Sequence, residues 1–232
     1  MPKFSTFNAF GSEAMNIGQN HVPVWLGVVT PVPVGGTLDK AYVKKGFYLG
    51  AGAPVELSGK IIKPFFAWEV VAFTAGDGST VTTDSIVIKD ANGAIPAVGD
   101  FIMKVGSAFS GTGKAAEVAS VDLLTTGDNA GCYEVKVAHS ATVDSLSAGD
   151  AVSLSSAAAA GSSKSLAVKP NGYLYNDIYL GDLDGDANAY TIAATGAVVM
   201  YHHEGLLVEL TPSAPVKAQM KAAVPGVYQH LV

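Results

Sequence analysis

Apolar side chains are densest in residues 65–73, where Glu69 is the only charged residue. A short run rich in aromatic and β-branched residues, bounded by Gly and Pro, is typical of a strand buried on both faces. A buried helix after Pro64 is the alternative, because periodicity alone does not separate the two. We expect residues 46–73 to organise the fold, with the other aromatic-rich segments packed around the apolar run Phe65, Phe66, Trp68, Val70, Val71 and Phe73.

The residues before this run predict extended structure interrupted by turns. Three prolines at positions 23, 31 and 33 exclude a helix interior and a central strand from residues 21–34. Gly35-Gly36 predicts a turn, and strands are expected at 41–49, with a break at 44–46, and at 53–57. Ser58-Gly59 predicts a tight turn after the second of these strands.

Residues 77–165 differ in composition from the rest of the chain. They hold three of the 20 aromatic residues, and 5 Lys against 10 Asp and Glu, whereas the remainder has 9 Lys against 10. We interpret 77–165 as an acidic all-β subdomain inserted into a split β-rich body formed by 1–76 and 166–232. Residues 153–165 have low complexity and predict a linker or an exposed loop.

Short strands with regular turns are expected inside this middle segment, as in a small sandwich or barrel. Two Gly-Asp turns each precede an apolar strand, at Gly99-Asp100 and Gly149-Asp150. Gly-Asp is a common turn pair, and we favour that explanation of the similarity. The expected strands are 85–89 and 101–105, which flank a turn at 90–93, and 117–123 and 133–138, which flank a turn at 127–129.

The C-terminal third predicts further hairpins and one helix. Strands are expected at 173–180, at 190–194 and 197–202 on either side of Thr195-Gly196, and at 206–210. The helix at 213–224 has Ser213 as its N-cap, Pro215 in its first turn and a stop at Pro225-Gly226. The fold class is therefore mainly β: a barrel or sandwich body with one short C-terminal helix and the inserted subdomain.

Composition narrows the classes of function that the protein can have. The 232 residues are 49% hydrophobic but only 15% charged, with a net charge of −6 and no Arg among the 14 basic residues. Nucleic-acid recognition depends on basic patches and Arg, so we exclude nucleic acid as a partner. A single cysteine, Cys132, excludes an internal disulfide, and the sequence has neither an 18-residue apolar run nor the apolar core of a signal peptide.

Two sequence features superficially suggest chemistry. The segment 111–114 contains Gly-Lys, but a phosphate-binding P-loop would need Gly at Ala108 and Ser or Thr at Ala115. Cys132 and His139 would face opposite sides of one strand, which disfavours a nucleophile–base pair. We therefore expect neither a nucleotide cofactor nor a catalytic residue.

A metal site is not expected either. Asp182, Asp184, Asp186 and Asn188 have the spacing of a calcium loop, but Ala187 and Ala193 stand where that loop needs Gly and Glu. An acidic turn is the favoured interpretation, and a weak cation site formed with other loops is the alternative. The adjacent pair His202-His203 is typical of a hairpin corner, and the other histidines are dispersed in the sequence.

Two segments resemble a known family. Residues 197–210, Thr211-Pro212 and the helix that ends before Pro225-Gly226-Val227 resemble the closing segment of tailed-phage head decoration and head fibre proteins. The Gly-rich turns and short strands of 46–60 are similar to the same proteins, and the whole layout resembles auxiliary capsid proteins of crAss-like phages. The middle of the chain shares only the architecture.

The resemblance implies a non-enzymatic virion protein, assembled in the bacterial cytoplasm, that binds the major capsid protein on the outside of the shell. Homo-oligomers or lattice neighbours are the other expected partners, with no membrane or cofactor. A head fibre base, a tail tube subunit, and a carbohydrate-binding module using Trp25, Trp68 or Tyr173 are the alternatives; for both Trp, core packing is favoured over sugar stacking. The candidate contacts with the capsid or neighbouring subunits are Phe4, Phe7, Phe10 and Tyr228.

Overall fold

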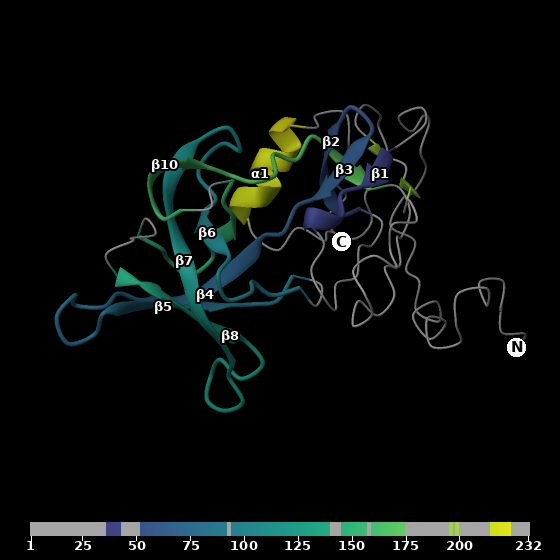
Figure 1. The fold of residues 1–232 in the computed structure, drawn as a ribbon. Helices are drawn as coiled ribbons and strands as arrows, with labels where there is room; N and C mark the ends of the chain where they lie inside the picture. Colours follow the sequence, from purple (N-terminus) through teal and green to yellow (C-terminus); the bar gives the residue numbers. More distant parts are fainter. Residues whose placement is uncertain are drawn as a thin grey trace, which may run out of the picture.

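A closed β-barrel forms the larger part of the structure, a computed structural model (Figure 1). The model describes residues 36–42, 52–91, 94–139, 145–156, 159–174, 195–196, 198–199 and 214–223. The barrel closes in the order β6-β9-β4-β5-β8-β7, because β7 pairs with both β6 and β8. Its strands are β4 (Trp68–Thr74), β5 (Thr83–Ile88), β6 (Phe101–Lys104), β7 (Thr112–Leu123), β8 (Tyr133–Ala138) and β9 (Ala151–Leu154).

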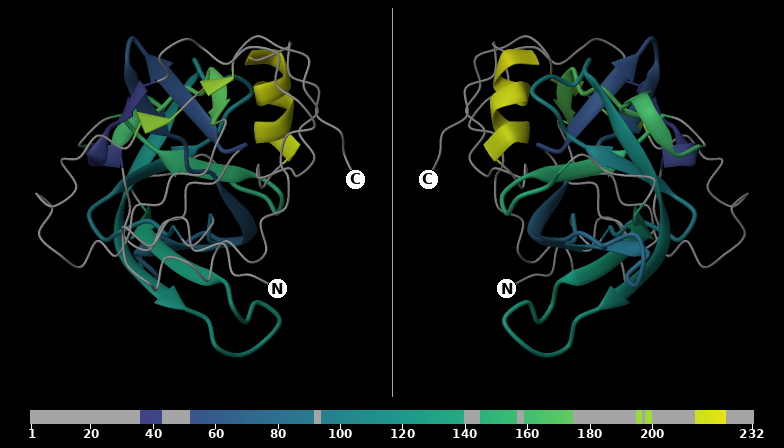
Figure 2. Two further views of the ribbon diagram at one scale, coloured as in Figure 1. Left: turned by 90° about the vertical axis from the view of Figure 1, so that its right-hand side faces the viewer. Right: turned by 90° about the vertical axis from the view of Figure 1, so that its left-hand side faces the viewer.

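A second sheet lies beside one end of the barrel (Figures 1 and 2). Its order is β12-β1-β3-β2-β11-β13, so that segments far apart in the sequence pair with one another. β2 and β3 form a hairpin whose turn begins at Gly59 with a φ of 62°. The strands are β1 (Gly36–Leu38), β2 (Pro54–Ser58), β3 (Ile61–Pro64), β11 (Gly172–Leu174), β12 (Thr195–Gly196) and β13 (Val198–Val199).

Two further elements complete the described structure. β10 (Gly161–Ser165) adds an edge to β7, and α1 (Ala214–Ala223) buries Val216 and Met220 between the barrel and the second sheet. The predicted fold class, a mainly β barrel body with one short C-terminal helix, is confirmed. Whether 77–165 is a separate subdomain stays a prediction, although β4, which precedes that segment, pairs with β5 and β9.

The apolar run predicted to organise the fold contributes to two hydrophobic cores. Phe66, Trp68 and Val70 belong to the barrel core, a cluster that continues into the second sheet through Val55 and Ile62. Phe65 and Ala67 point the other way, into a helix-side core beneath α1. This alternation has the period of an extended chain, and β4 confirms the predicted strand over the helix alternative.

The barrel consists of two similar halves, β4-β5-β6 and β7-β8-β9. The pairs Trp68↔Val152 and Glu69↔Ala151 correspond to Ala116↔Ile102 and Glu117↔Phe101. The register also shifts at the same place in each half: Val70↔Ile88 is followed by Ala72↔Val87, and Val118↔Val137 is followed by Ser120↔Lys136. An approximate two-fold axis therefore relates the halves.

The two Gly-Asp turns occupy equivalent places in this repeat. Gly99 and Gly149 both have a φ of 88°, and the carboxylates of Asp100 and Asp150 accept the N–H of Ala97 and Ser147 at 2.7 and 2.8 Å. Gly99 and Gly149 donate to the carbonyls of Val118 and Val70, each at 2.9 Å. The interpretation that their similarity reflects only a common turn pair is therefore wrong.

Three other local predictions are corrected by the structure. Gly36 begins β1 instead of turning the chain, and a Cβ there would lie 2.8 Å from Cγ1 of Ile62, so glycine permits close packing. Residues 40–42 form a 3-10 helix because Asp39 accepts the N–H of Ala41 at 3.0 Å; positions 43–49 lie outside the described residues. Thr195-Gly196, predicted as a turn, is β12.

The low-complexity segment 153–165 is also more ordered than predicted. Ser153 lies in β9 with 2% of its surface exposed, and its Oγ donates to the carbonyl of Phe66 at 2.5 Å. Residues 161–165 form β10, with a bulge between Gly161 and Lys164. Small polar residues suit these positions because their hydroxyls bond to neighbouring backbone.

Trp68 gives a direct test of the barrel core. It is fully buried, and its Nε1–H donates to the carbonyl of Ala94 at 2.9 Å. We expect Trp68→Ala to lower the free energy of unfolding by about 3–5 kcal/mol, measured by urea denaturation. Val98→Ala is the control, because Val98 is 67% exposed and its loss should cost less than about 0.5 kcal/mol. A similar loss in both variants would contradict the assignment of Trp68 to the core.

Candidate functional surface

Side chains fill the interior of the barrel. Ile86, Ile88, Ile102, Val135 and Val152 are fully buried there beside Trp68. An eight-stranded barrel is only just wide enough to be filled by its own side chains, so a barrel of six strands is narrower still. Whatever this barrel binds must therefore bind to its outside.

Two hairpin arms extend from the barrel (Figure 1). One joins β4 to β5 through residues 75–82, and the other joins β7 to β8 through residues 124–132. Each arm begins at a register shift, between Val70 and Ala72 or between Val118 and Ser120. The approximate two-fold axis relates them, so the same construction is presented twice.

The loop of the β4–β5 arm is held by Asp77. Its Oδ1 accepts the N–H groups of Ser79, Thr80 and Val81 at 2.8, 2.7 and 2.8 Å. These bonds favour the charged form, and the one from Val81 contributes most to lowering the pKa of Asp77 to about 2. The loop is thus ordered although Asp77 is exposed.

A buried carboxylate fastens the same loop to β8. Asp84 is 2% exposed; its Oδ1 accepts the N–H of Gly76 at 2.8 Å and lies 2.6 Å from Nδ1 of His139. The N–H of His139 also donates to the carbonyl of Thr82 at 2.9 Å. A carboxylate–imidazole pair can serve catalysis, but these contacts tie both ends of the loop to the barrel, which is an anchoring role.

The pair Asp84–His139 was not predicted from the sequence, where His139 was weighed only against Cys132. Cys132 and His139 stand just beyond opposite ends of β8, in agreement with the prediction that they form no dyad. The alternation of Asp84, Ile86 and Ile88 predicts a carboxylate on the inward face of a strand, but it does not identify His139 as the partner.

Several other candidates are also placed by the structure. Thr112 and Lys114 lie in strand β7, so no helix N-terminus follows the Gly-Lys pair, and the rejection of a P-loop is confirmed. Trp68 and Tyr173 are fully buried, which removes both from an exposed sugar-stacking platform. The predicted contacts Phe4, Phe7, Phe10 and Tyr228 lie outside the described residues, as do Trp25, the acidic segment 182–188 and His202-His203.

The part of the chain that the structure describes has neither a metal-binding cluster nor a membrane-spanning helix. Within it, no group of three or more His, Cys, Asp or Glu side chains is arranged to hold a metal ion. Of the helices described, none has the length and apolar character needed to cross a bilayer.

The Asp77 loop predicts a specific pH dependence. Because its pKa is lowered on folding, the ionised carboxylate stabilises the loop above the unfolded value near 4, and this contribution is lost as the pH falls towards 2. We expect carbon-detected NMR titration to give a pKa of about 2 for Asp77. In Asp77→Asn the amides of residues 79–81 should exchange faster at pH 6, while the amide of Leu124 in the other arm should not. An unshifted pKa would contradict the observed bonds.

Comparison with known proteins gives no further assignment. No family model matches the chain, and neither a curated protein nor a solved structure is detectably similar to it.

Proposed function

We propose that this protein is a structural component of a tailed-phage virion that binds the outside of the capsid shell as a decoration or auxiliary, cementing protein. The observation that carries the proposal is the barrel whose interior is occupied by its own side chains and whose two arms project outward. The resemblance of residues 46–60 and 197–227 to head decoration proteins supports the same assignment.

Composition supports this role in a second way. Only 15% of the residues are charged and 49% are hydrophobic. A low charge content suits a protein that works by burying area against neighbours, and a stable interface of this kind covers at least roughly 1,000 Å². The major capsid protein is the proposed partner, together with neighbouring copies, and the proposed role requires no catalysis or cofactor.

The carbohydrate-binding alternative has lost most of its support. A sugar platform needs exposed aromatic faces, and two of its three candidate residues, Trp68 and Tyr173, are buried. A head fibre base or a tail tube subunit would use the same outward surfaces, so the location on the particle separates these from the capsid assignment.

Binding to shells tests the proposal. We expect purified protein to co-sediment at a fixed ratio with expanded shells of the phage that encodes it, prepared without this protein. Replacing Phe4, Phe7 and Phe10 by Ala should remove about 2 kcal/mol of binding free energy, or roughly 30-fold in Kd, if these residues are interface anchors.

The matched control is Val98→Ser, a change at an exposed apolar side chain of the barrel that should bind as the wild type does. Absence of co-sedimentation would contradict the proposal, and binding to purified tail tubes in place of shells would assign the protein to the tail.

A further inference from the structure

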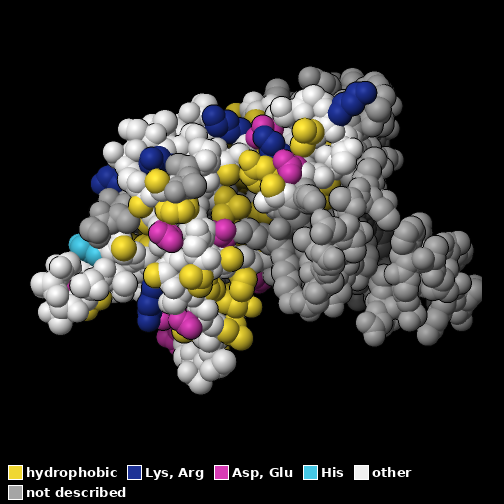
Figure 3. Space-filling view, viewed as in Figure 1, with side chains coloured by type: hydrophobic (Ala, Val, Ile, Leu, Met, Phe, Trp, Pro, Cys, Tyr) yellow, Lys and Arg dark blue, Asp and Glu magenta, His cyan; other side chains and the backbone are white. Residues whose placement is uncertain are grey.

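The described structure is divided into two parts of opposite charge. The barrel segment, residues 68–156 as far as they are described, carries 4 Lys against 10 Asp and Glu, a net charge of −6. The second sheet, β10 and α1, in residues 36–64, 159–174, 195–199 and 214–223 as described, carry 7 Lys against 2 Asp and Glu, a net charge of +5. Figure 3 shows Lys side chains along the upper rim and most acidic side chains below it.

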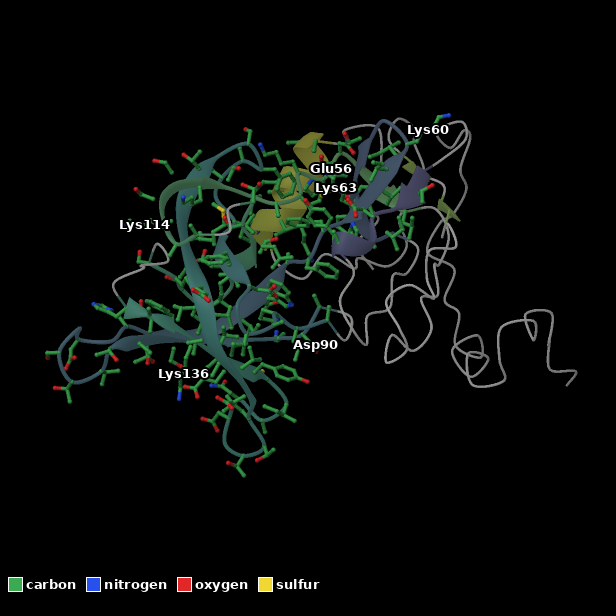
Figure 4. The ribbon with its side chains drawn as sticks, viewed as in Figure 1. Glu56, Lys60, Lys63, Asp90, Lys114 and Lys136 are labelled. Atoms are coloured by element: carbon green, nitrogen blue, oxygen red, sulfur yellow. The ribbon has the colours of Figure 1, made fainter. Side chains whose placement is uncertain are left out.

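The positive part presents exposed lysines from three separate elements. Lys60 is in the β2–β3 turn, Lys169 follows β10, and Lys221 is in the last turn of α1, and all three are exposed. Lys63, by contrast, is compensated by Glu56 at 3.6 Å. Figure 4 shows Lys60 and Lys63 at the top of the molecule and Lys136 low on the barrel. We call Lys60, Lys169 and Lys221 the basic end.

The β7–β8 arm carries the opposite charge. Asp122 and Asp128 are exposed on it, and Leu123 between them is 53% exposed. Glu134, also on this arm, is accompanied by Lys136 at 3.6 Å. Both further views show this arm at the bottom and α1 with the β2–β3 hairpin at the top (Figure 2). We call Asp122, Leu123 and Asp128 the acidic arm; it lies at the opposite end of the described structure from the basic end.

Part of the backbone edge of the acidic arm has no partner among the residues that the structure describes. Along residues 118–123, β7 pairs with β8 on one side, and on the other side β6 and its turn reach only as far as Val118. No described residue pairs with the outer edge of β7 from Ser120 to Leu123. An open strand edge beside an exposed leucine favours contact with another protein chain.

We infer that the acidic arm of one copy docks on the basic end of a second copy. The complementary charges at opposite ends argue for a copy of this chain as the occupant, because every copy carries both an acidic arm and a basic end. Such a head-to-tail contact is heterologous and produces rings or rows. The inference extends the proposed function, and rests on it for its setting, by naming the contact between neighbouring copies on a shell.

The magnitude of this interaction is small in free solution. Exposed ion pairs contribute about 0–1 kcal/mol each, so the two pairs that Asp122 and Asp128 can form, with one apolar contact, give weak association. When two copies are already bound to the same shell, the contact between them becomes effectively intramolecular, and the high effective concentration strengthens it. Weak, salt-sensitive self-association of the free protein is therefore the property to measure.

Reversing the charges on each of the two surfaces by mutation tests the inference. Sedimentation velocity of the wild type at about 0.01 M salt, where the Debye length is about 30 Å, should show a sedimentation coefficient that rises with concentration. At about 1 M salt, with a Debye length of about 3 Å, this rise should disappear. The double variants Lys60→Glu/Lys221→Glu and Asp122→Lys/Asp128→Lys should each remain monomeric, and an equimolar mixture of the two should associate again.

The mixture is the internal control. It contains the same two altered proteins that are tested singly, but only in the mixture can surfaces of opposite charge meet. A wild type that stays monomeric at low salt, or a mixture that fails to associate, would overturn the inference. Loss of shell binding by Lys60→Glu/Lys221→Glu, with a wild type that is monomeric in solution, would assign the basic end to the shell instead and also overturn it. All self-association measurements use free protein, so their outcome is independent of whether shells are bound.

Discussion

The alternation of side chains along residues 65–70 is the constraint on which the rest of the structure depends. Phe66, Trp68 and Val70 enter the barrel core while Phe65 and Ala67 enter the helix-side core. A one-residue shift of this segment would exchange the two sets between cores whose shapes they do not fit, and each mismatch in a packed core costs about 1–3 kcal/mol. β6, β7, β9 and β11 also divide adjacent residues between the two clusters, so residues 65–70 are one of several stretches of chain that fix the two cores relative to each other.

The repeat explains how the interior is filled while the two outward hairpins differ. Two similar halves close the barrel, and at equivalent positions they place Trp68 in one half and Ala116 in the other. The larger side chain reaches Ala94 and fills the core, which leaves the outward hairpins free to differ in sequence. One arm is ordered by Asp77 and Asp84, and the other carries Asp122 in β7 and Asp128 in its loop.

The sequence predicts elements better than it predicts their partners. β4, β8 and α1 follow from local patterns: an apolar run, alternation between turns, and a proline-initiated helix. The pairing of β1 with β3 and β12 joins distant segments that carry no local signal of each other. The repeat was hidden because its halves share turn chemistry and strand spacing but few identical side chains.

For the candidate site, too, predictions that needed only local spacing succeeded, and those that needed strand pairing did not. Rejecting a P-loop and a Cys132–His139 dyad needed only spacing and strand geometry, and the structure agrees with both. The Asp84–His139 anchor could not be inferred without pairing, because β5 and β8 bring these residues together across many intervening positions. Phe4, Phe7, Phe10 and Tyr228 stay predictions, because they lie outside the described residues.

Native-state hydrogen exchange tests most directly the claim that the barrel core continues into the second sheet. The amide of Val118 donates to the carbonyl of Asp100 at 2.8 Å in the barrel, and that of Leu174 donates to Ala53 at 2.9 Å in the second sheet. A shared core predicts that both amides open with the same free energy and that Phe66→Ala lowers both equally. Exchange of Leu174 at a lower free energy that Phe66→Ala leaves unchanged would show that the two sheets unfold independently, and would contradict this account.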